Sequence, residues 1–252
     1  MGCRTAETPI EQNHQIGSEE ESQIVDTAQY QRLVGKLIYL AHTRPDIAYA
    51  VSVVSQFMHD PRERHLQAVT RILRYLKNNP GRGLLFKRDE KLSLEVYTDA
   101  DHAGSIVDRR STSGYCMFLG GNLVTWRSKK QTVVARSSTE SEFRAMAHGV
   151  CELLWMKIIL DDLKVHYEAP MRLFCDNKSA ISIAHNPVQH DRTKHIEIER
   201  HFIKEKLDNG LIETTYVPSR GQLADILTKG LPTKQFKFLT DKLGMIDIHS
   251  PA

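Results

Sequence analysis

The stretch LSLEVYTD, from Leu92 to Asp99, is the part of this sequence that decides the fold. Leu92, Leu94 and Val96 alternate with polar or larger side chains, which is the period of two of a strand that buries one face. The strand runs into Asp99, so we expect that carboxylate near the C-terminal end of the strand. A carboxylate beside a core costs free energy unless a positive charge compensates it. Asp99 is therefore the first candidate for a cation-binding residue.

Three later carboxylates stand in comparable contexts. Asp176 ends a second apolar strand, and α/β sheets place ligands at the carboxyl ends of strands. Glu142 is expected in the first turn of a long helix and Asp225 in the first turn of a late one. Each has an ordinary explanation as well, because helix N-termini favour carboxylates and Asp176, beside Asn177, suits a turn.

Taken together, the four carboxylates predict a metal centre. Carboxylates that converge repel one another, and a divalent ion such as Mg²⁺, which prefers oxygen ligands, removes that cost. Two such ions about 3.5–4 Å apart serve in-line displacement at phosphorus. We therefore expect two Mg²⁺ ions, with Mn²⁺ as the alternative, held by the residues that also carry catalysis: Asp99, Glu142, Asp176 and Asp225.

The patterns on either side of this strand divide the chain into three parts. Residues 1–26 lack periodicity and carry six acidic residues against one basic residue, which predicts an extended acidic tail that acts as a solvated linker. Residues 27–91 carry three helical stripes and predict an all-helical segment. In residues 92–252, three antiparallel strands precede helices that alternate with two more strands. This order predicts an α/β domain with a mixed five-stranded sheet flanked by helices.

Composition limits the class of protein more than its function. The 252 residues are 40% hydrophobic and 26% charged, which fits a globular protein, and the net charge of +3 does not by itself argue for nucleic acid. No stretch predicts a membrane span or a signal peptide, so we expect an intracellular protein without a membrane partner. The four cysteines are scattered, which favours free thiols in a reducing compartment.

Five blocks of the sequence occur in a telling order: YTDAD (97–101), STSGYCMFLGGNLVTWRSKKQTVVARSSTESEFRAM (111–146), CDNKSAISIAHNP (175–187), KHIEIERHFIKE (194–205) and QLADILTKGL (222–231). They resemble the ribonuclease H domain of Ty1/copia-type retrotransposon Pol polyproteins. The earlier block YQRLVGKLIYLAHTRPDIAYAV (30–51) is similar to the helices that connect polymerase and ribonuclease H in the same polyproteins.

The resemblance implies a ribonuclease H-like fold and a two-metal hydrolase that cuts the RNA strand of RNA–DNA hybrids endonucleolytically. The chain would be a C-terminal piece of the polyprotein, with its reverse transcriptase domain as partner. By motif, Asp99, Glu142, Asp176 and Asp225 match the four family acids. The alternative is a catalytically inactive, nucleic-acid-binding remnant. A transposase or integrase is disfavoured, because those enzymes present their glutamate last, whereas Glu142 comes second here.

Two departures and a set of substrate contacts complete the expectations. The loop Pro218–Leu223 lacks the histidine that many cellular ribonucleases H carry there, and no Tyr-x-Asp-Asp polymerase signature occurs. A hybrid duplex is read through its shape, phosphates and 2′-hydroxyls. Basic and short polar side chains near the acids are the expected substrate-binding residues: Arg127, Lys129, Lys130, Arg136, Asn177 and Ser113.

Overall fold

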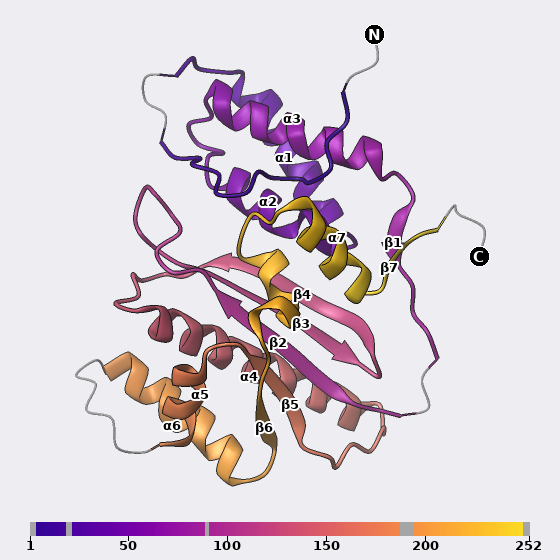
Figure 1. Cartoon of the computed structure of the whole chain (residues 1–252), viewed down its shortest axis with the longest axis vertical. Coiled ribbons are helices and arrows are strands. Elements are labelled where there is room, and N and C mark those ends of the chain that lie inside the picture. Colours follow the sequence, from indigo (N-terminus) through magenta and orange to yellow (C-terminus); the bar gives the residue numbers. More distant parts are fainter. Residues whose placement is uncertain (1–3, 19–21, 89–90, 187–193, 249–252) are drawn as a thin grey trace.

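The computed structural model describes residues 4–18, 22–88, 91–186 and 194–248, without the side chains of 194–197. Figure 1 shows a group of helices stacked on one face of a twisted sheet, with further helices on the other face. Within the described residues, no helix has both the length and the apolar character that crossing a membrane requires.

The predicted helical segment forms three helices. They are α1 (Thr27–Ala41), α2 (Pro45–Ser55) and α3 (Glu63–Asn78). Asp26 caps α1 by accepting from the backbone N of Gln29 at 3.0 Å. Pro45 begins α2, where its missing N–H costs nothing. Short-range signals therefore account for where these helices start.

The N-terminal segment differs from the solvated linker that its composition predicts. Residues 4–18 contain no helix or strand, but Thr8, Pro9 and Ile10 are buried. The carbonyl of Gly17 lies 2.8 Å from Nε2 of the buried His65 on α3. The segment thus packs across the helices (Figure 1), because it contributes apolar side chains to their core.

The five-stranded mixed sheet is confirmed. Its strands are β2 (Leu94–Ala100), β3 (Thr112–Leu119), β4 (Asn122–Lys130), β5 (Met171–Cys175) and β6 (Ile212–Tyr216), in the order β4-β3-β2-β5-β6. The pairs β2–β3 and β3–β4 are antiparallel, whereas β5 runs parallel to β2 and β6 parallel to β5. Gly120 and Gly121 close the β3–β4 hairpin with positive φ, which glycine adopts without strain.

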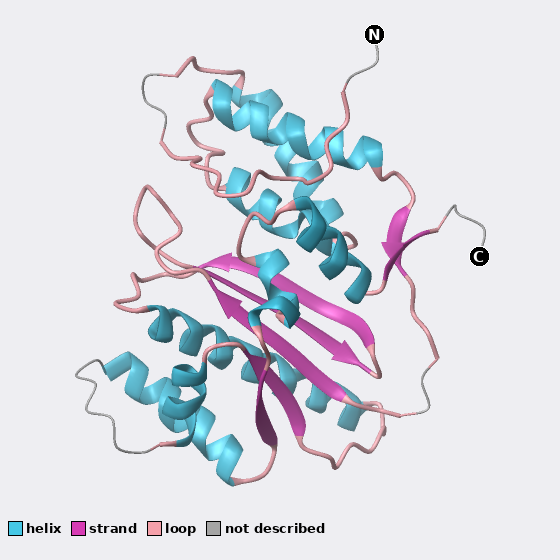
Figure 2. Ribbon diagram, in the orientation of Figure 1, coloured by secondary structure: helices cyan, strands magenta, loops and turns pink. Residues whose placement is uncertain are grey.

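Each face of the sheet has its own hydrophobic core. On one face lie α4 (Ser138–Asp162), α5 (Lys178–His185) and α6 (Lys194–Asp208). On the other face lie the helices α1–α3, two short 3₁₀ turns, η1 (Ser219–Gly221) and η2 (Leu223–Leu227), and α7 (Thr233–Lys242). Figure 2 shows these layers.

A small second sheet joins two distant parts of the chain. The strand β1 (Arg82–Leu84) pairs antiparallel with β7 (Met245–Asp247). The sequence predicts that the segment before the large sheet is all helical. Instead, this segment ends in the strand β1. Three residues without a periodic pattern carry no local strand signal, so the pairing depends on α7 bringing β7 alongside.

Candidate active site

Asp99 lies in β2 and is almost completely buried, with 1% of its surface exposed. In the sheet register it stands opposite Gly114 of β3. Because Gly114 has no side chain, Leu227 and Thr228 can approach the sheet closely at this point. The Thr228 hydroxyl donates to Oδ2 of Asp99, so the buried carboxylate receives a hydrogen bond from the far end of the chain.

The sequence predicts Asp225 in the first turn of an α-helix, but the residue lies in the 3₁₀ turn η2. Its Oδ1 is 2.8 Å from Nζ of Lys229, which is also 3.4 Å from Oδ2 of Asp99. Nε2 of Gln235 donates to the other oxygen of Asp225 at 3.3 Å. Burial and the negative charge of Asp99 raise the pKa of Asp225, although Lys229 opposes them. Asp99 and Asp225 are thus brought together around one ammonium group.

Glu142 lies in the second turn of α4, not the first, because the helix begins at Ser138. Ser137 caps the helix, and Glu140 holds its first turn by accepting from the backbone N of Arg136 at 2.8 Å. Glu140 also pairs with Arg144 at 2.9 Å, so it has a structural role. Glu142 is left to face the carboxylates.

Glu142 is buried among other acids, an environment that suits a ligand of a cation. The residue is 6% exposed, and its Oε2 has no hydrogen-bond partner among the described residues. Burial raises its pKa most, and the negative charges of Asp99 and Asp176 raise it further. A buried acid surrounded by acids costs stability unless it is protonated or a cation binds.

Asp176 follows β5 directly and completes the set. One ligand atom from each of Glu142, Cys175 and Asp176 lies within 4.8 Å of the other two. Burial raises the pKa of the Cys175 thiol, so it stays protonated and is a poor ligand for a hard ion. The Ser219 hydroxyl donates to Oδ2 of Asp176 at 2.8 Å. The carboxylates are therefore the donors that fit Mg²⁺.

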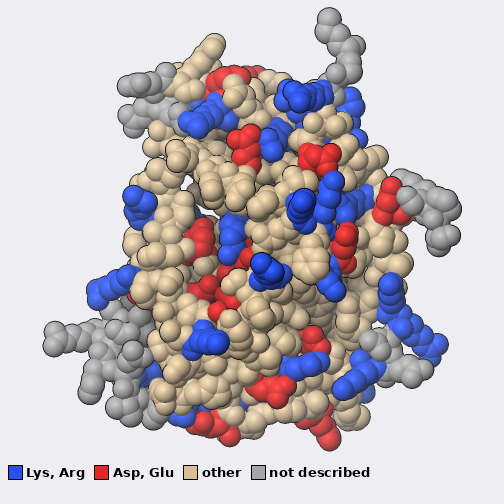
Figure 3. All heavy atoms as spheres, in the orientation of Figure 1, with Lys and Arg blue, Asp and Glu red and all other residues tan. Residues whose placement is uncertain are grey.

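The charge balance also fits a divalent ion. The negative charges of Asp99 and Asp176 raise the pKa of both Glu142 and Asp225, and Lys229 is in ion-pair contact with Asp99 and Asp225. Figure 3 shows acidic side chains in a hollow near the middle of this face, with basic side chains beside them. Such a set of hard oxygen donors favours Mg²⁺ or Mn²⁺ over softer metals.

Three side chains of this site escaped the sequence interpretation: Thr228, Lys229 and Ser219. Thr228 and Lys229 follow Asp225 at spacings of three and four, which place them on the same side of a helical turn. That spacing is a usable signal once Asp225 is a candidate. Ser219 carries no comparable signal, because only the parallel pairing of β5 and β6 brings it near Asp176.

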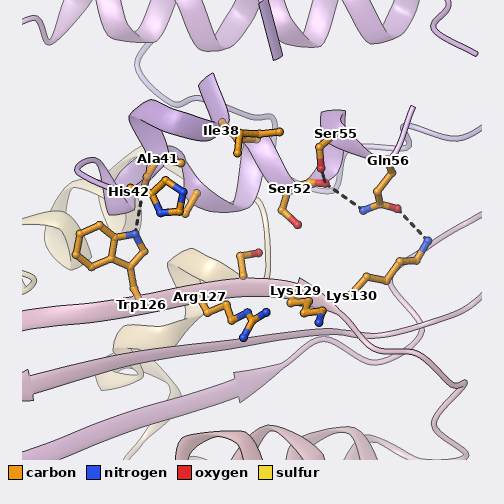
Figure 4. A pocket seen from close by; sticks show the side chains of 13 residues that line it. Ile38, Ala41, His42, Ser52, Ser55, Gln56, Trp126, Arg127, Lys129 and Lys130 are labelled. Carbon is orange, nitrogen blue, oxygen red and sulfur yellow. Dashed lines mark hydrogen bonds between the residues drawn. The ribbon is translucent and has the colours of Figure 1, made fainter. Parts of the chain in front are cut away.

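The predicted substrate-binding residues on β4 line two hollows. A groove of about 460 Å³ separates β4 from α1 and α2 (Figure 4). In it, Nζ of Lys130 donates to Oε1 of Gln56 and pairs with Asp108, each at 2.9 Å. Arg127 and Lys129 line this groove and also a pocket of about 140 Å³ that includes His148 of α4. All three basic side chains therefore line the groove, and two of them reach the smaller pocket as well.

The other predicted contacts have structural partners. Oδ1 of Asn177 caps α5 by accepting from the backbone N of Ala180 at 2.9 Å. Ser113 is buried, and its hydroxyl accepts from Nε2 of Gln131 at 2.9 Å. Arg136 is exposed beside the start of α4. Of this group, Arg136 has the side chain most available to a ligand.

The fold and the site together define a class of protein. The mixed sheet has the strand order β4-β3-β2-β5-β6. Acids lie at the end of the central strand, on the first long helix after the hairpin, after the next parallel strand and on a late turn. This arrangement is that of the ribonuclease H-like fold. No family model matches the chain. Among solved structures, LC11-RNase H1 in complex with RNA/DNA hybrid aligns with a TM-score of 0.42 and 13% identity, over 54% of this chain and 94% of that one.

Comparison with curated proteins identifies the relatives. The Pol polyprotein from transposon RE1 of Arabidopsis thaliana is 43% identical over 238 residues, and that from transposon RE2 is 40% identical over 248 residues. These matches cover 94% and 98% of the chain but only 16% and 17% of the relatives, so the chain spans about a sixth of their length. Secreted RxLR effector protein 161 of Plasmopara viticola is 48% identical over 130 residues, 51% of this chain and 92% of that protein. Nearly the whole chain thus matches one segment of the retrovirus-related Pol polyproteins of copia-type transposons, and its large sheet with the flanking helices has the ribonuclease H-like topology that the sequence predicts.

Proposed function

We propose that this chain hydrolyses the RNA strand of RNA–DNA hybrids with the help of two divalent metal ions. The observation that carries the proposal is the convergence of four carboxylates, one of which, Glu142, is buried with an oxygen that has no hydrogen-bond partner in the described part of the chain. A purely structural site would not retain a buried acid beside Asp99 and Asp176, because their repulsion lowers the stability of the fold.

The four acids would hold the ions, and the neighbouring groups would keep the acids in place. Bound ions of this kind activate the attacking water and stabilise charge on the leaving oxygen. The Thr228 hydroxyl orients Asp99, and the Ser219 hydroxyl orients Asp176. Nε2 of Gln222 donates to the carbonyl of Thr98 at 3.0 Å, which ties η2 to the end of β2. The products would carry a 3′-hydroxyl and a 5′-phosphate.

The partners in this proposal follow from the family. RNA–DNA hybrid is the substrate, and the reverse transcriptase domain of the same polyprotein would supply it. Arg136, exposed beside the first turn of α4, would contact a phosphate of the hybrid close to Glu142. We retain Arg127 and Lys129 as further contacts, because neither has an ion pair among the described residues.

Cleavage of a labelled RNA–DNA hybrid tests the proposal. The purified chain should cut the RNA strand with Mg²⁺ and not with EDTA, and Asp99→Asn should reduce the rate by several orders of magnitude. Asp161→Asn is the matched control, because Asp161 is an exposed acid near the C-terminal end of α4. Single-stranded RNA of the same sequence should survive.

Each other outcome has a defined meaning. Equal cleavage by the parent and Asp99→Asn would reject the assigned site. Binding of the hybrid without cleavage by either protein would favour the non-catalytic remnant. Degradation of single-stranded RNA at a similar rate would point to a different kind of nuclease.

A further inference from the structure

Lys229 occupies the space between two of the candidate metal ligands. It follows Asp225 by four residues, so one helical turn brings the two side chains together. Its Nζ lies 2.8 Å from Oδ1 of Asp225 and 3.4 Å from Oδ2 of Asp99. The side chain of Lys229 is 42% exposed, whereas those of Asp225 and Asp99 are 5% and 1% exposed. The ammonium therefore enters the buried site from the solvent side.

The ammonium and a metal ion would need the same oxygens. Mg²⁺ binds carboxylate oxygens at about 2.0–2.1 Å. An ammonium within hydrogen-bond distance of Asp225 and near Asp99 would therefore compete with a divalent ion for these oxygens. Two adjacent cations would also repel each other strongly in a partly buried site.

Lys229 is charged where it stands. Its ammonium faces carboxylate oxygens of both Asp99 and Asp225, and an ammonium is the ordinary state of a lysine side chain at neutral pH. Truncating the side chain of Lys229 would therefore leave the carboxylates of Asp99 and Asp225 close together without the positive charge that offsets their repulsion. In the protein without metal, this lysine supplies part of the positive charge that ions supply otherwise.

We propose that Lys229 is a resident counter-ion of the site, which holds Asp99 and Asp225 together in the metal-free protein and is displaced when a divalent ion binds. This inference rests on the proposed function for the identity of the ligands and adds a residue that regulates their affinity. The lysine stabilises the empty site and, by the same contacts, weakens metal binding. The side chain of Lys229 is long and partly exposed, so it can swing toward solvent without a rearrangement of the backbone.

Direct titration of the metal-free chain with Mg²⁺ tests the inference without measuring hydrolysis. Isothermal titration should find that Lys229→Met binds Mg²⁺ about tenfold more tightly than the parent, a difference of about 1.4 kcal/mol. Thermal unfolding in EDTA should show a lower midpoint for Lys229→Met, and the difference should vanish at saturating Mg²⁺. Lys234→Met is the matched control, because Lys234 is an exposed lysine of α7, and it should change neither quantity.

Two further variants keep the inference testable. Lys229→Arg retains the charge and should not tighten Mg²⁺ binding. Lys229→Gln removes the charge but keeps a hydrogen-bond donor, and it should tighten binding even if Lys229→Met does not fold. Unchanged or weaker binding of Mg²⁺ in the neutral variants would overturn the proposal.

The same experiments separate this inference from the proposed function. If the parent fails to cleave a hybrid but the neutral variants bind Mg²⁺ more tightly, the counter-ion role stands and the hydrolase assignment fails. If the parent cleaves the hybrid but the neutral variants bind Mg²⁺ like the parent, only the counter-ion role fails.

Discussion

Adding a single methyl group at Gly114 should move one half of the site away from the other. Gly114 stands opposite Asp99 in the sheet, and a Cβ there would lie 2.7 Å from Cγ2 of Thr228 and 2.8 Å from Cβ of Leu227. Carbon atoms pack at about 3.5–4.0 Å, so η2 must retreat from β3 by about 1 Å. Because η2 carries Asp225, the distance between Asp225 and Asp99 increases.

The magnitudes follow from this displacement. Overpacking of this kind costs about 1–3 kcal/mol of unfolding free energy, and a shift of about 1 Å in a catalytic group lowers a rate about a hundredfold. Gly114→Ala should therefore unfold at lower urea concentration and cleave a labelled hybrid about a hundredfold more slowly. Gly35→Ala is the matched control, because nothing lies within 4 Å of a Cβ at Gly35 in helix α1. That control should be as active as the parent and more stable by up to about 1 kcal/mol. Parental activity and stability in Gly114→Ala would refute the close-packing argument.

Two further perturbations test the electrostatics. Burial and the charges of Asp99 and Asp176 raise the pKa of Glu142 in the folded protein above that of an ordinary carboxyl group. The protonated Glu142 therefore stabilises the fold fully below the ordinary carboxyl pKa, and this stabilisation is lost as the pH rises toward the raised pKa. In EDTA, the free energy of unfolding measured with urea should therefore fall from about pH 5 to about pH 8, and Glu142→Gln should flatten that slope; an unaltered slope in Glu142→Gln would contradict the assignment. Arg44→Ala would leave Asp46 buried without the guanidinium that contacts it at 2.7 Å. The variant should lose about 3–5 kcal/mol of unfolding free energy, measured by urea denaturation. A loss below about 1 kcal/mol would show that the hydroxyl of Tyr75, which donates to Asp46, is enough to stabilise the buried carboxylate.

Much of the fold could be predicted because its signals are local. The alternation in β2, the Asp26 cap of α1 and the proline that begins α2 are short-range effects of side-chain direction and backbone hydrogen bonding. Helix α5 likewise begins directly after Asn177, whose side chain caps it. The mixed five-stranded sheet follows from the order of such elements.

Predictions failed where the sequence pattern is weak or ambiguous. The tail was expected to be solvated because of its charge, but a few apolar residues, including Ile10, are enough to anchor it. Asp225 was expected in an α-helix, yet the chain forms only a 3₁₀ turn before α7, since η2 must fit against β3 at Gly114. Periodicity over a few residues does not distinguish these alternatives.

The sequence by itself determined which residues could form strands, helices and a set of acids, because each of those properties depends on near neighbours. Only the tertiary structure decided that Thr228 donates to Asp99, 129 residues earlier, and that Lys229 lies between Asp99 and Asp225. Such contacts depend on strand order and on which faces bury their apolar side chains. They therefore arise from the free energy of the whole packed core, which no local pattern contains.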